Sequence, residues 1–273
     1  MKKTDLSIII PTWNTAEITK KCIDTINSHL PDSLKYEIII VDNNSTDNTS
    51  KIIPGLPNVV YIKNSANFGF SKGNNIGFKR AAGEYLLFLN SDMELTDSNL
   101  TGMLDFYRKP NLHIGVIGPQ FLNPDLSLQA SVFPPQTAIN AAREYWLNIP
   151  KSYSKYQPDN NEPLEVDAIS GGAILISAAL FQKIGGWDER YFMYFEDLEL
   201  CRKVRNLGYK IYFYPGMEVI HRHGASGQKL AGSDFQWRRL IPSSKIYHGL
   251  LNYYLISFIL WSGQKMHKLF SKN

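Results

Sequence analysis

The chain has 273 residues, of which 44% are hydrophobic and 20% are charged, a composition that excludes wholesale disorder. No stretch of about 18 uncharged apolar residues occurs, which excludes a clear transmembrane helix. The apolar run near the N-terminus is too brief for a signal peptide. Only Cys22 and Cys201 could form a disulfide, and both lie in helical patterns. We therefore expect a cytosolic protein without disulfides.

Positive charge gathers near the C-terminus, although the net charge is only +4. Residues 1–201 contain 17 Lys and Arg against 23 Asp and Glu, whereas residues 202–273 contain 12 against 2. This asymmetry indicates that the last quarter of the chain meets phosphates, another polyanion or an anionic membrane surface. The alternative is a basic tail that is simply solvated.

Short apolar strands alternate with helical patterns in the first half of the chain. The expected strands are 6–11, 37–42, 58–63 and 84–90, and the expected helices are 16–30, with Thr15 as its N-cap, and 73–82. Strands that alternate with helices at this spacing predict a mostly parallel sheet that is covered on both faces.

Polar residues follow three of these strands. Thr12 and Asn14 follow the first, residues 42–47 end and follow the second, and Asn90 and Asp92 end and follow the fourth. Ligands of open α/β sheets bind outside the carboxyl ends of the strands. We therefore expect the functional site where these three clusters meet.

The second half is less regular. Residues 119–165 are rich in proline, and the polar stretch 151–162 is typical of a long loop. Regular structure is expected again near 166–176, followed by a helix from Ala178 to the Gly185-Gly186 pair. A second helix should run through Asn206 with Gly208 as its C-terminal stop, and residues 209–214 alternate like a strand.

Taken singly, each candidate motif has a plain structural interpretation. Asp42 could form a turn or cap a helix. Glu196 and Asp197 are acids at a helix start, where the helix dipole favours negative charge. A lone His221 is more often structural than a ligand. No Gly-x-Gly-x-x-Gly or Walker sequence is present, which argues against a dinucleotide or P-loop site.

The order of the motifs carries a stronger signal. The chain runs Ser7-Ile-Ile-Ile-Pro-Thr-Trp-Asn14, Ile40-Val-Asp-Asn-Asn-Ser-Thr-Asp47, Asn67-Phe-Gly-Phe-Ser-Lys-Gly-Asn74, Phe88-Leu-Asn-Ser-Asp92, Gly185-Gly-Trp-Asp-Glu189, Tyr194-Phe-Glu-Asp197 and His221-Arg-His-Gly-Ala-Ser226. This series closely resembles glycosyltransferase family 2, especially its rhamnosyltransferase-like members of bacterial surface-polysaccharide assembly. The resemblance covers about residues 5–226.

The resemblance implies a GT-A fold, an α/β architecture with a Rossmann-like, mixed but mostly parallel sheet flanked by helices. It places one glycosyltransferase domain at 1–226, with a nucleotide-sugar-binding half at about 1–118 and an acceptor-binding half at 119–226. Residues 227–273 would form a basic, partly apolar C-terminal helical extension. The implied reaction is inverting sugar transfer by a single displacement.

The resemblance also implies the donor site. Asp42 would accept a hydrogen bond from the N3–H of uracil or thymine, and Pro11, Thr12 and Asn14 would line the base and ribose pocket. Lys72 would offer a cation to the donor, although a surface lysine is the alternative. The complete set of nucleotide-sugar-binding candidates is Pro11, Thr12, Asn14, Asp42, Asn67, Gly69, Lys72, Asn74, Asn90, Ser91 and Asp92.

A divalent metal, Mn²⁺ or Mg²⁺, is the expected cofactor, because departure of a nucleoside diphosphate builds negative charge that a cation can neutralise. Asp92 matches the last acid of the family's Asp-x-Asp metal motif. Asn90 stands at the first acid, which should weaken the affinity of the protein for metal. By the resemblance His221 is a further ligand, with His223 as a weaker candidate.

An acceptor hydroxyl must lose its proton as it attacks, so a carboxylate must lie against it. By the resemblance Asp197 is the general base, and Glu196 orients the acceptor or supports Asp197. Asp188 and Glu189 are alternatives, and Glu189 is also expected on the acceptor side. Trp187 could stack on a sugar ring or belong to the core.

The C-terminal extension contains 14 uncharged residues, 249–262, too few to span a membrane comfortably. Aromatic side chains together with the flanking Lys245, Lys265, Lys268 and Lys272 favour a helix in the membrane interface. Packing on the domain itself or on a second subunit is the alternative. Gln236-Trp-Arg-Arg239 only faintly resembles the Gln-x-x-Arg-Trp signature of processive synthases, which favours a non-processive enzyme.

The sequence thus predicts a metal-dependent inverting glycosyltransferase (a hexosyltransferase) that uses a UDP- or dTDP-sugar, with rhamnose as the leading donor. The acceptor would be a saccharide or a lipid-linked saccharide at the inner face of the plasma membrane. No nucleic-acid partner is expected. The alternative is a catalytically silent GT-A protein that binds nucleotide-sugar or acts as a scaffold. The joint presence of Asp42, Asp92, Asp197 and His221 argues against it.

Overall fold

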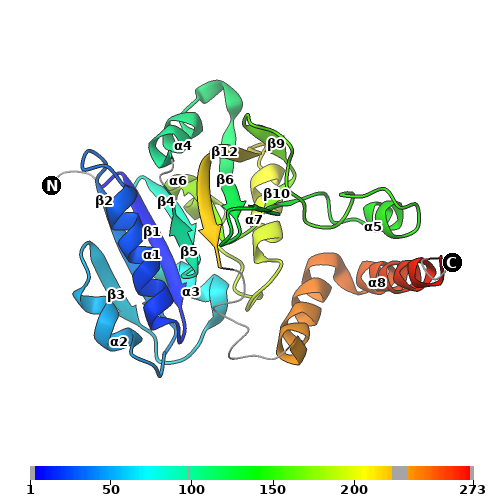
Figure 1. Cartoon of the computed structure of the whole chain (residues 1–273), viewed down its shortest axis with the longest axis horizontal. Helices are drawn as coiled ribbons and strands as arrows, with labels where there is room; N and C mark the ends of the chain where they lie inside the picture. The colour runs from blue at the N-terminus through cyan, green and yellow to red at the C-terminus, as the bar shows by residue number, and fades with distance from the viewer. Residues whose placement is uncertain (1–3, 97–98, 223–232, 271–273) are drawn as a thin grey trace.

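The computed structural model describes residues 4–96, 99–222 and 233–270, with backbone alone at 233–239 and 268–270. A central twisted sheet carries helices on both faces, and two helices, α5 and α8, form an arm on one side (Figure 1). The strands of the main sheet are β1 (Leu6–Thr12), β2 (Tyr36–Asp42), β3 (Val59–Lys63), β4 (Tyr85–Leu89), β5 (Met93–Leu95), β6 (Ile114–Leu122), β7 (Leu128–Gln129), β9 (Leu164–Val166), β11 (Ala173–Ser177) and β12 (Lys210–His221).

The first four strands form the parallel part of the sheet, in the order β3-β2-β1-β4. β1 is buried along almost its whole length. Ile8 packs among the helices of one face, whereas Ile9 packs among those of the other. Apolar residues therefore occupy consecutive positions, as is typical of a strand covered on both sides. The four strands predicted from the sequence are confirmed to within one residue at most ends.

The sheet continues in the order β11-β6-β12-β5. β11 runs antiparallel to both β4 and β6, while β12 pairs parallel with β6. A separate two-stranded sheet pairs β8 (Val132–Phe133) with β10 (Ala168–Ile169). The predicted α/β class with a mixed, mostly parallel sheet is confirmed.

The helices are α1 (Ala16–His29), α2 (Thr49–Ile52), α3 (Gly69–Phe78), α4 (Leu100–Tyr107), α5 (Ala138–Tyr145), α6 (Ala178–Lys183), α7 (Glu196–Asn206) and α8 (Ser233–Phe270), with short 3₁₀ turns at Ile53–Gly55 and Pro110–Leu112. The expected cap of α1 differs in its chemistry. Thr15 occupies the N-cap but makes no capping hydrogen bond with its side chain. Asp47, from the loop after β2, accepts the N–H of Ala16 at 3.0 Å instead.

α3 begins four residues before the predicted start. The Asn67 side chain accepts the N–H of Gly69 at 3.0 Å, so the helical turn starts there. Gly69 has φ +80°, and a Cβ at this position would lie 2.4 Å from the Phe192 carbonyl oxygen. Only glycine fits this start, since the backbone of a distant loop passes directly against it.

α8 is divided by a kink at Gly249, whose φ of 73° and ψ of 161° are not helical. The part after the kink packs on α5 through a small core of Ala141, Ile256 and Ile259 (Figure 1). The predicted C-terminal helical extension is thereby confirmed. The expected boundary at 226 lies outside the described residues. Within the described part of the chain, no helix is long and apolar enough to cross a membrane.

Candidate active site

The carboxyl ends of β1, β2 and β4 lie side by side at one edge of the sheet. Thr12 is in register with Asp42 across the β1–β2 pair, and β4 lies on the other side of β1. Asn90 follows β4 directly, and the Ser91 hydroxyl lies 3.4 Å from the Thr15 hydroxyl after β1. The structure therefore brings together the three polar clusters that the sequence placed at strand ends.

Asp42 is completely buried, and the surrounding loop fixes its carboxylate. The Ser45 N–H donates to Oδ1 at 2.8 Å, and the Tyr61 hydroxyl of β3 donates to Oδ2. Burial and this hydrogen bond raise the pKa of Tyr61, so the hydroxyl keeps its proton as the donor. Tyr61 was not recognised from the sequence, because only the β2–β3 register places its side chain beside Asp42.

Asn14 locks the turn after β1 onto the loop after β2. It has φ 55°, its N–H donates to the Ser45 hydroxyl at 2.8 Å, and its side-chain oxygen accepts the Thr46 N–H at 2.7 Å. The Thr12 hydroxyl lies 2.8 Å from the hydroxyls of both Thr15 and Thr19. These bonds hold the backbone around Asp42 in one arrangement, which suits recognition of a flat ring.

We expect Asp42→Ala to weaken UDP or dTDP binding by about 1–3 kcal/mol, the cost of losing a hydrogen bond to a charged group. Titration calorimetry with the free nucleotide measures this directly. Tyr61→Phe is the matched control, because it removes an internal partner of Asp42 but keeps the carboxylate, and it should have the smaller effect. Unchanged affinity in Asp42→Ala would remove this residue from the nucleotide pocket.

The start of α3 borders the same edge. The Asn43 amide donates to the Gly69 carbonyl at 3.1 Å, and Pro11 approaches Gly73 closely. The Lys72 ammonium lies 4.3 Å from the centre of the Phe68 ring, so the lysine is oriented by a cation–π contact. Asn74 is fully buried and donates to the Phe70 carbonyl at 3.1 Å, which gives it a structural contact inside the helix.

Asp92 and His221 form the candidate metal site. Asp92 follows β4, and His221 ends β12 beside Met93 of β5. Both side chains are buried, and His221 Nε2 lies 3.6 Å from Asp92 Oδ1. Among the described residues no hydrogen-bond donor reaches this Asp92 oxygen. A buried carboxylate oxygen in this state suits a cation. His223 lies outside the described residues.

Gln129 of β7, which sequence analysis missed, sets the protonation of the His221 ring. Its amide nitrogen donates to Asn123 Oδ1 at 2.7 Å and to the His221 carbonyl at 3.3 Å, so its oxygen must face the ring. His221 Nδ1 lies 2.7 Å from that oxygen and therefore carries the proton. In the neutral ring Nε2 then has the lone pair, on the side of Asp92, as a metal ligand requires.

The Asp92 carboxylate and the His221 imidazole are suitable ligands for a divalent cation, but two protein ligands do not complete its coordination. The described residues contain no cluster of three His, Cys, Asp or Glu side chains that could hold an ion without help. Oxygen atoms of a bound diphosphate would have to complete the coordination, as expected where Asn90 replaces an acid.

Glu196 and Asp197 open α7, after Tyr194 and Phe195, which both have positive φ. Both carboxyl groups are buried. Asp197 accepts the Gly171 N–H at 2.9 Å on Oδ2 and the Leu198 N–H at 2.8 Å on Oδ1. Burial raises the pKa of Asp197, and these two N–H groups oppose the shift. Asp197 is thus a fixed carboxylate with a raised pKa, as a general base requires.

Burial and the neighbouring Asp197 raise the pKa of Glu196 well above its ordinary value. Oxygen Oε2 of Glu196 has no hydrogen-bond partner in the described part of the chain. Lys155, from the loop at 151–162, is close enough to Asp197 to favour its charged form, although burial lowers the pKa of the lysine itself. The negative charge of the pair therefore belongs on Asp197, with the proton on Glu196.

Glu196→Gln should become more stable than the native chain as the pH rises. The folded pKa of Glu196 is raised, so its contribution to stability is complete below its ordinary value of 4.5 and is lost as pH rises through the folded pKa. Gln mimics the protonated acid and removes this decline. Melting temperatures measured from about pH 5 to 9 should diverge. Glu165→Gln, at an exposed acid, is the control, and parallel curves for Glu196→Gln would contradict the assignment.

The Gly185–Glu189 motif lies against α3. Trp187 is only 2% exposed and packs edge-on against Phe70 and Phe88, which is the position of a core tryptophan. The Asp188 carboxylate binds Arg190, which lowers its pKa. Glu189 accepts from the Asn75 amide at 3.0 Å. Of the four acids considered as the base, Asp197 therefore has the environment that fits best.

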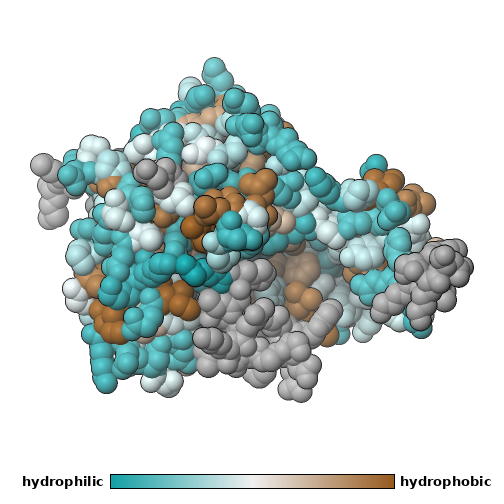
Figure 2. Space-filling view, in the orientation of Figure 1, coloured by the Kyte–Doolittle hydropathy of each residue, from teal (hydrophilic) through white to brown (hydrophobic). Residues whose placement is uncertain are grey.

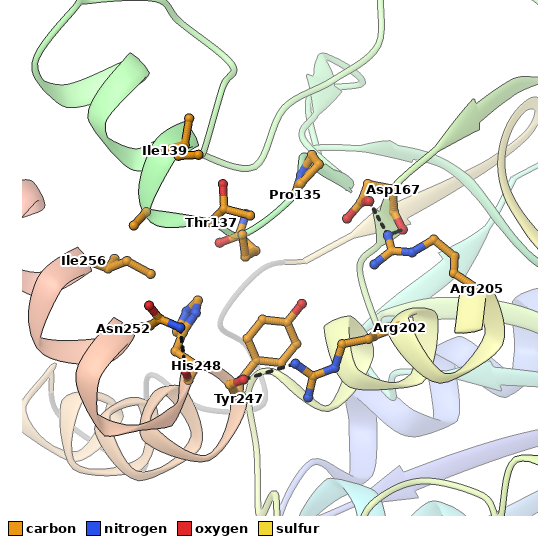
Figure 3. Close-up of a pocket in the computed structure, with 12 residues that line it drawn as sticks. Pro135, Thr137, Ile139, Asp167, Arg202, Arg205, Tyr247, His248, Asn252 and Ile256 are labelled. Carbon is orange, nitrogen blue, oxygen red and sulfur yellow. Dashed lines mark hydrogen bonds and ion pairs between the residues drawn. The ribbon is translucent and has the colours of Figure 1, made fainter. Parts of the chain in front are cut away.

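A cavity of about 480 Å³ separates α7 from α8 and from the start of α5 (Figure 3). Two arginines of α7 point toward it, but both have partners. Arg205 pairs with Asp167, and Arg202 donates to the Tyr247 carbonyl at 3.1 Å and pairs with Glu199. Burial lowers the pKa of His248, on the opposite wall, to about 4. The lining ties α8 to the helix that carries Glu196 and Asp197.

The family profile described as glycosyl transferase family 2 matches residues 7–185, which is more than half of the chain. The chain belongs to glycosyltransferase family 2. A second profile, the N-terminal domain of galactosyltransferase, matches residues 152–224 of this family 2 glycosyltransferase, a range that contains Asp197 and His221.

The family 2 enzyme resembles several curated proteins. It is 28% identical over 209 residues to the N-acetylglucosaminyl-diphospho-decaprenol L-rhamnosyltransferase of Mycobacterium tuberculosis (strain CDC 1551 / Oshkosh), covering 69% of this chain and 67% of that protein. It is 26% identical to the low-salt glycan biosynthesis hexosyltransferase Agl10 of Haloferax volcanii, covering 98% and 86%. It is 24% identical to the rhamnosyltransferase WbbL of Escherichia coli K12, covering 84% and 88%.

Solved structures share the fold of this glycosyltransferase. The structure of GalNAc-T7 with UDP, GalNAc and Mn²⁺ has a TM-score of 0.64 at 16% identity, over 81% of this chain and 44% of that longer one. The mannosyltransferase PcManGT from Pyrobaculum calidifontis, in complex with GDP-Man and Mn²⁺, has a TM-score of 0.60 at 16% identity, over 94% and 65%. The predicted family and GT-A fold are both confirmed.

Proposed function

We propose that this glycosyltransferase moves a sugar, with inversion, from a UDP- or dTDP-sugar to a saccharide or lipid-linked saccharide in cell-surface glycan assembly. The observation that carries the proposal is the proximity of Asp92 to His221, whose Nδ1 is hydrogen-bonded to Gln129, at the strand edge that also holds Asp42. Asp197 supplies a separate, buried carboxylate for the acceptor.

On the donor side, Asp42 reads the base and the loop around Asn14 holds its pocket. Asp92 and His221 would hold a divalent cation, which supplies neutralisation of the charge that develops on the departing diphosphate. Lys72 lies at the start of α3, near the same edge, and adds a cation there.

On the acceptor side, Asp197 accepts the proton of the attacking hydroxyl. The hydroxyl oxygen forms the new bond to the anomeric carbon while the bond from that carbon to the diphosphate breaks. Glu196 stays protonated and keeps a second negative charge away from the base. One displacement of this kind inverts the configuration at the anomeric carbon.

The names of the relatives support the substrate class. Two of them are rhamnosyltransferases, and one acts on a diphospho-decaprenol-linked sugar by its name. We therefore propose rhamnose from dTDP-rhamnose as the donor sugar and a lipid-linked saccharide as the acceptor. Because the Haloferax relative is named only as a hexosyltransferase, the test should also include other hexoses as donor sugars.

The test is turnover of a panel of nucleotide-sugars by the purified chain, followed as release of nucleoside diphosphate with and without Mn²⁺. We expect one UDP- or dTDP-sugar to be turned over, with dTDP-rhamnose first, and the release to depend on the metal. Tight binding of a nucleotide-sugar without turnover, in the presence of lipid-linked acceptors, would favour the silent binding or scaffold protein instead.

A further inference from the structure

The arm formed by α5 and α8 exposes a group of large hydrophobic side chains. Leu251 is 89% exposed and Leu147 is 66% exposed. Soluble proteins expose such residues singly, whereas a contiguous group marks an interaction site. We call the group the arm surface, and its members are Trp146, Leu147, Ile149, Leu250, Leu251, Tyr254, Leu255, Phe258, Trp261 and Met266.

Direct contacts join the two parts of the arm surface, although they are more than 100 residues apart in the sequence. Trp146 donates its ring N–H to the Ser262 hydroxyl at 2.9 Å, and its ring centre lies 6.5 Å from that of Phe258. Phe258 in turn lies 6.2 Å from Trp261. Figure 2 shows a small group of hydrophobic side chains on the upper side of this arm, where α5 lies.

The helix geometry of α8 separates a packed face from an open one. Ile256 and Ile259 point toward α5 and are buried. Leu250, Tyr254, Phe258 and Trp261 follow one another at spacings of three and four residues and therefore share the other face. The helix is thus apolar on both faces. Among the described residues, the face of Ile256 and Ile259 is buried against α5, whereas the other face is largely exposed.

All the charged side chains of α8 after Asp234 are positive. Residues 235–273 contain six Lys and Arg and no Asp or Glu. The Lys265 ammonium lies 4.4 Å from the centre of the Trp261 ring, and Lys245 lies 5.2 Å from that of Tyr253. The acid of α5, Glu144, already accepts the N–H groups of Tyr153 and Ser154.

We propose that the arm surface lies in the interface of an anionic lipid bilayer, with the part of α8 after Gly249 parallel to the membrane plane. Its Leu and Phe side chains would enter the acyl boundary, Trp and Tyr rings would lie at the headgroups, and the lysines would meet lipid phosphates. A second copy of the chain fits less well, because two such surfaces would bring lysines together, and the described part of the arm offers only Glu144, whose carboxylate already has partners.

The first part of α8 connects the membrane-binding arm to the residues beside Glu196 and Asp197. The Ser243 hydroxyl donates to the Met193 carbonyl at 2.8 Å, and Tyr247 and His248 pack on Phe195, the residue before Glu196. A bilayer under the arm would therefore stand at a fixed position relative to Asp197, as a lipid-linked acceptor requires. Binding to lipid itself does not depend on sugar transfer, so the two can fail separately.

The experiment is co-sedimentation of the full chain with vesicles of pure phosphatidylcholine and of an equimolar mixture with phosphatidylglycerol. The native chain should bind the anionic vesicles, and salt should weaken binding. The double variant Leu251→Glu/Phe258→Glu should bind the vesicles at least about tenfold more weakly. Burial of even one such apolar side chain in the bilayer raises the affinity by about that factor. Lys265→Gln should lower the affinity for anionic vesicles about fivefold and leave binding to pure phosphatidylcholine unchanged.

Leu126→Glu is the matched control, because Leu126 is similarly exposed but lies on the turn before β7, and this variant should bind like the native chain. Equal melting temperatures establish that the variants fold. Native-like vesicle binding by the double variant, or no binding by the native chain, would overturn the proposal. So would a native dimer, measured by sedimentation equilibrium without lipid, that the double variant dissociates, since a second copy would then cover the arm surface.

Discussion

Replacement of Asp197 with Asn is expected to slow sugar transfer by about 10²–10⁴-fold, the usual contribution of a general base. Asn has the same size but cannot take the proton of the acceptor hydroxyl. In native Asp197 each carboxylate oxygen accepts one backbone N–H, from Gly171 or from Leu198. Asn has an NH₂ group in place of one of these oxygens, so one of the two hydrogen bonds is lost, which should cost about 0.5–1.5 kcal/mol of stability. Donor affinity should barely change, because the proposed mechanism places this carboxylate against the acceptor and not against the diphosphate.

Three measurements on one purified variant separate the alternatives: transfer rate, donor affinity and melting temperature. If Asp197 is merely an acid at a helix start, it contributes about 0.3–1 kcal/mol to stability and nothing to the rate. Asp105→Asn, at an exposed acid of α4, is the control for the chemical change. A variant of Asp197 that melts earlier yet turns over normally would refute its role as base and direct attention to Asp188.

The second large effect concerns the metal site. Asp92→Ala and His221→Ala should each abolish most activity and weaken Mn²⁺-dependent donor binding. Gln129→Leu should lower metal affinity by about 10–100-fold, because the His221 ring would lose the partner that fixes its proton on Nδ1. Calorimetric titration of Mn²⁺ into the UDP complex measures these affinities without reference to turnover.

Gln136→Leu is the matched control, since Gln136 makes comparable bonds to the Pro134 and Tyr153 carbonyls outside the metal site. It should leave Mn²⁺ affinity unchanged. Full activity and an intact metal response in His221→Ala would show that His221 is not a ligand.

The parallel part of the fold was predictable, because local sequence determines it. Runs such as Ile8-Ile9-Ile10 in β1 must be buried on both faces, and this requirement alone indicates a strand between two helical layers. β11 was expected only as regular structure without direction. Its antiparallel place between β4 and β6 depends on long-range pairing, which a local pattern does not specify.

The middle of the chain was the least predictable. Its prolines indicated loops, and β6 and α5 were not recognised there. α5 is short, and its buried residue Ala141 packs on Ile256 and Ile259 of α8, so its stability comes from a partner far along the chain.

The candidate site shows the same division. Motif order located Asp42, Asp92, Asp197 and His221, whereas the residues that tune them escaped notice. Tyr61, Gln129 and Lys155 each act on a candidate residue from another strand or from the 151–162 loop. Contacts of this kind join residues that are distant in the sequence and leave no periodic pattern in it, so they become visible only in the folded chain.

The kink in α8 has a consequence for recognising relatives of this chain. Gly249 has a backbone conformation that is essentially restricted to glycine. The direction in which the second part of α8 leaves the first part therefore depends on one residue without a side chain. We expect homologues whose last helix folds back on α5 to have glycine at this place, and homologues with another residue there to direct that helix elsewhere. A single position could thus serve as a marker that sorts the family by the orientation of its C-terminal arm.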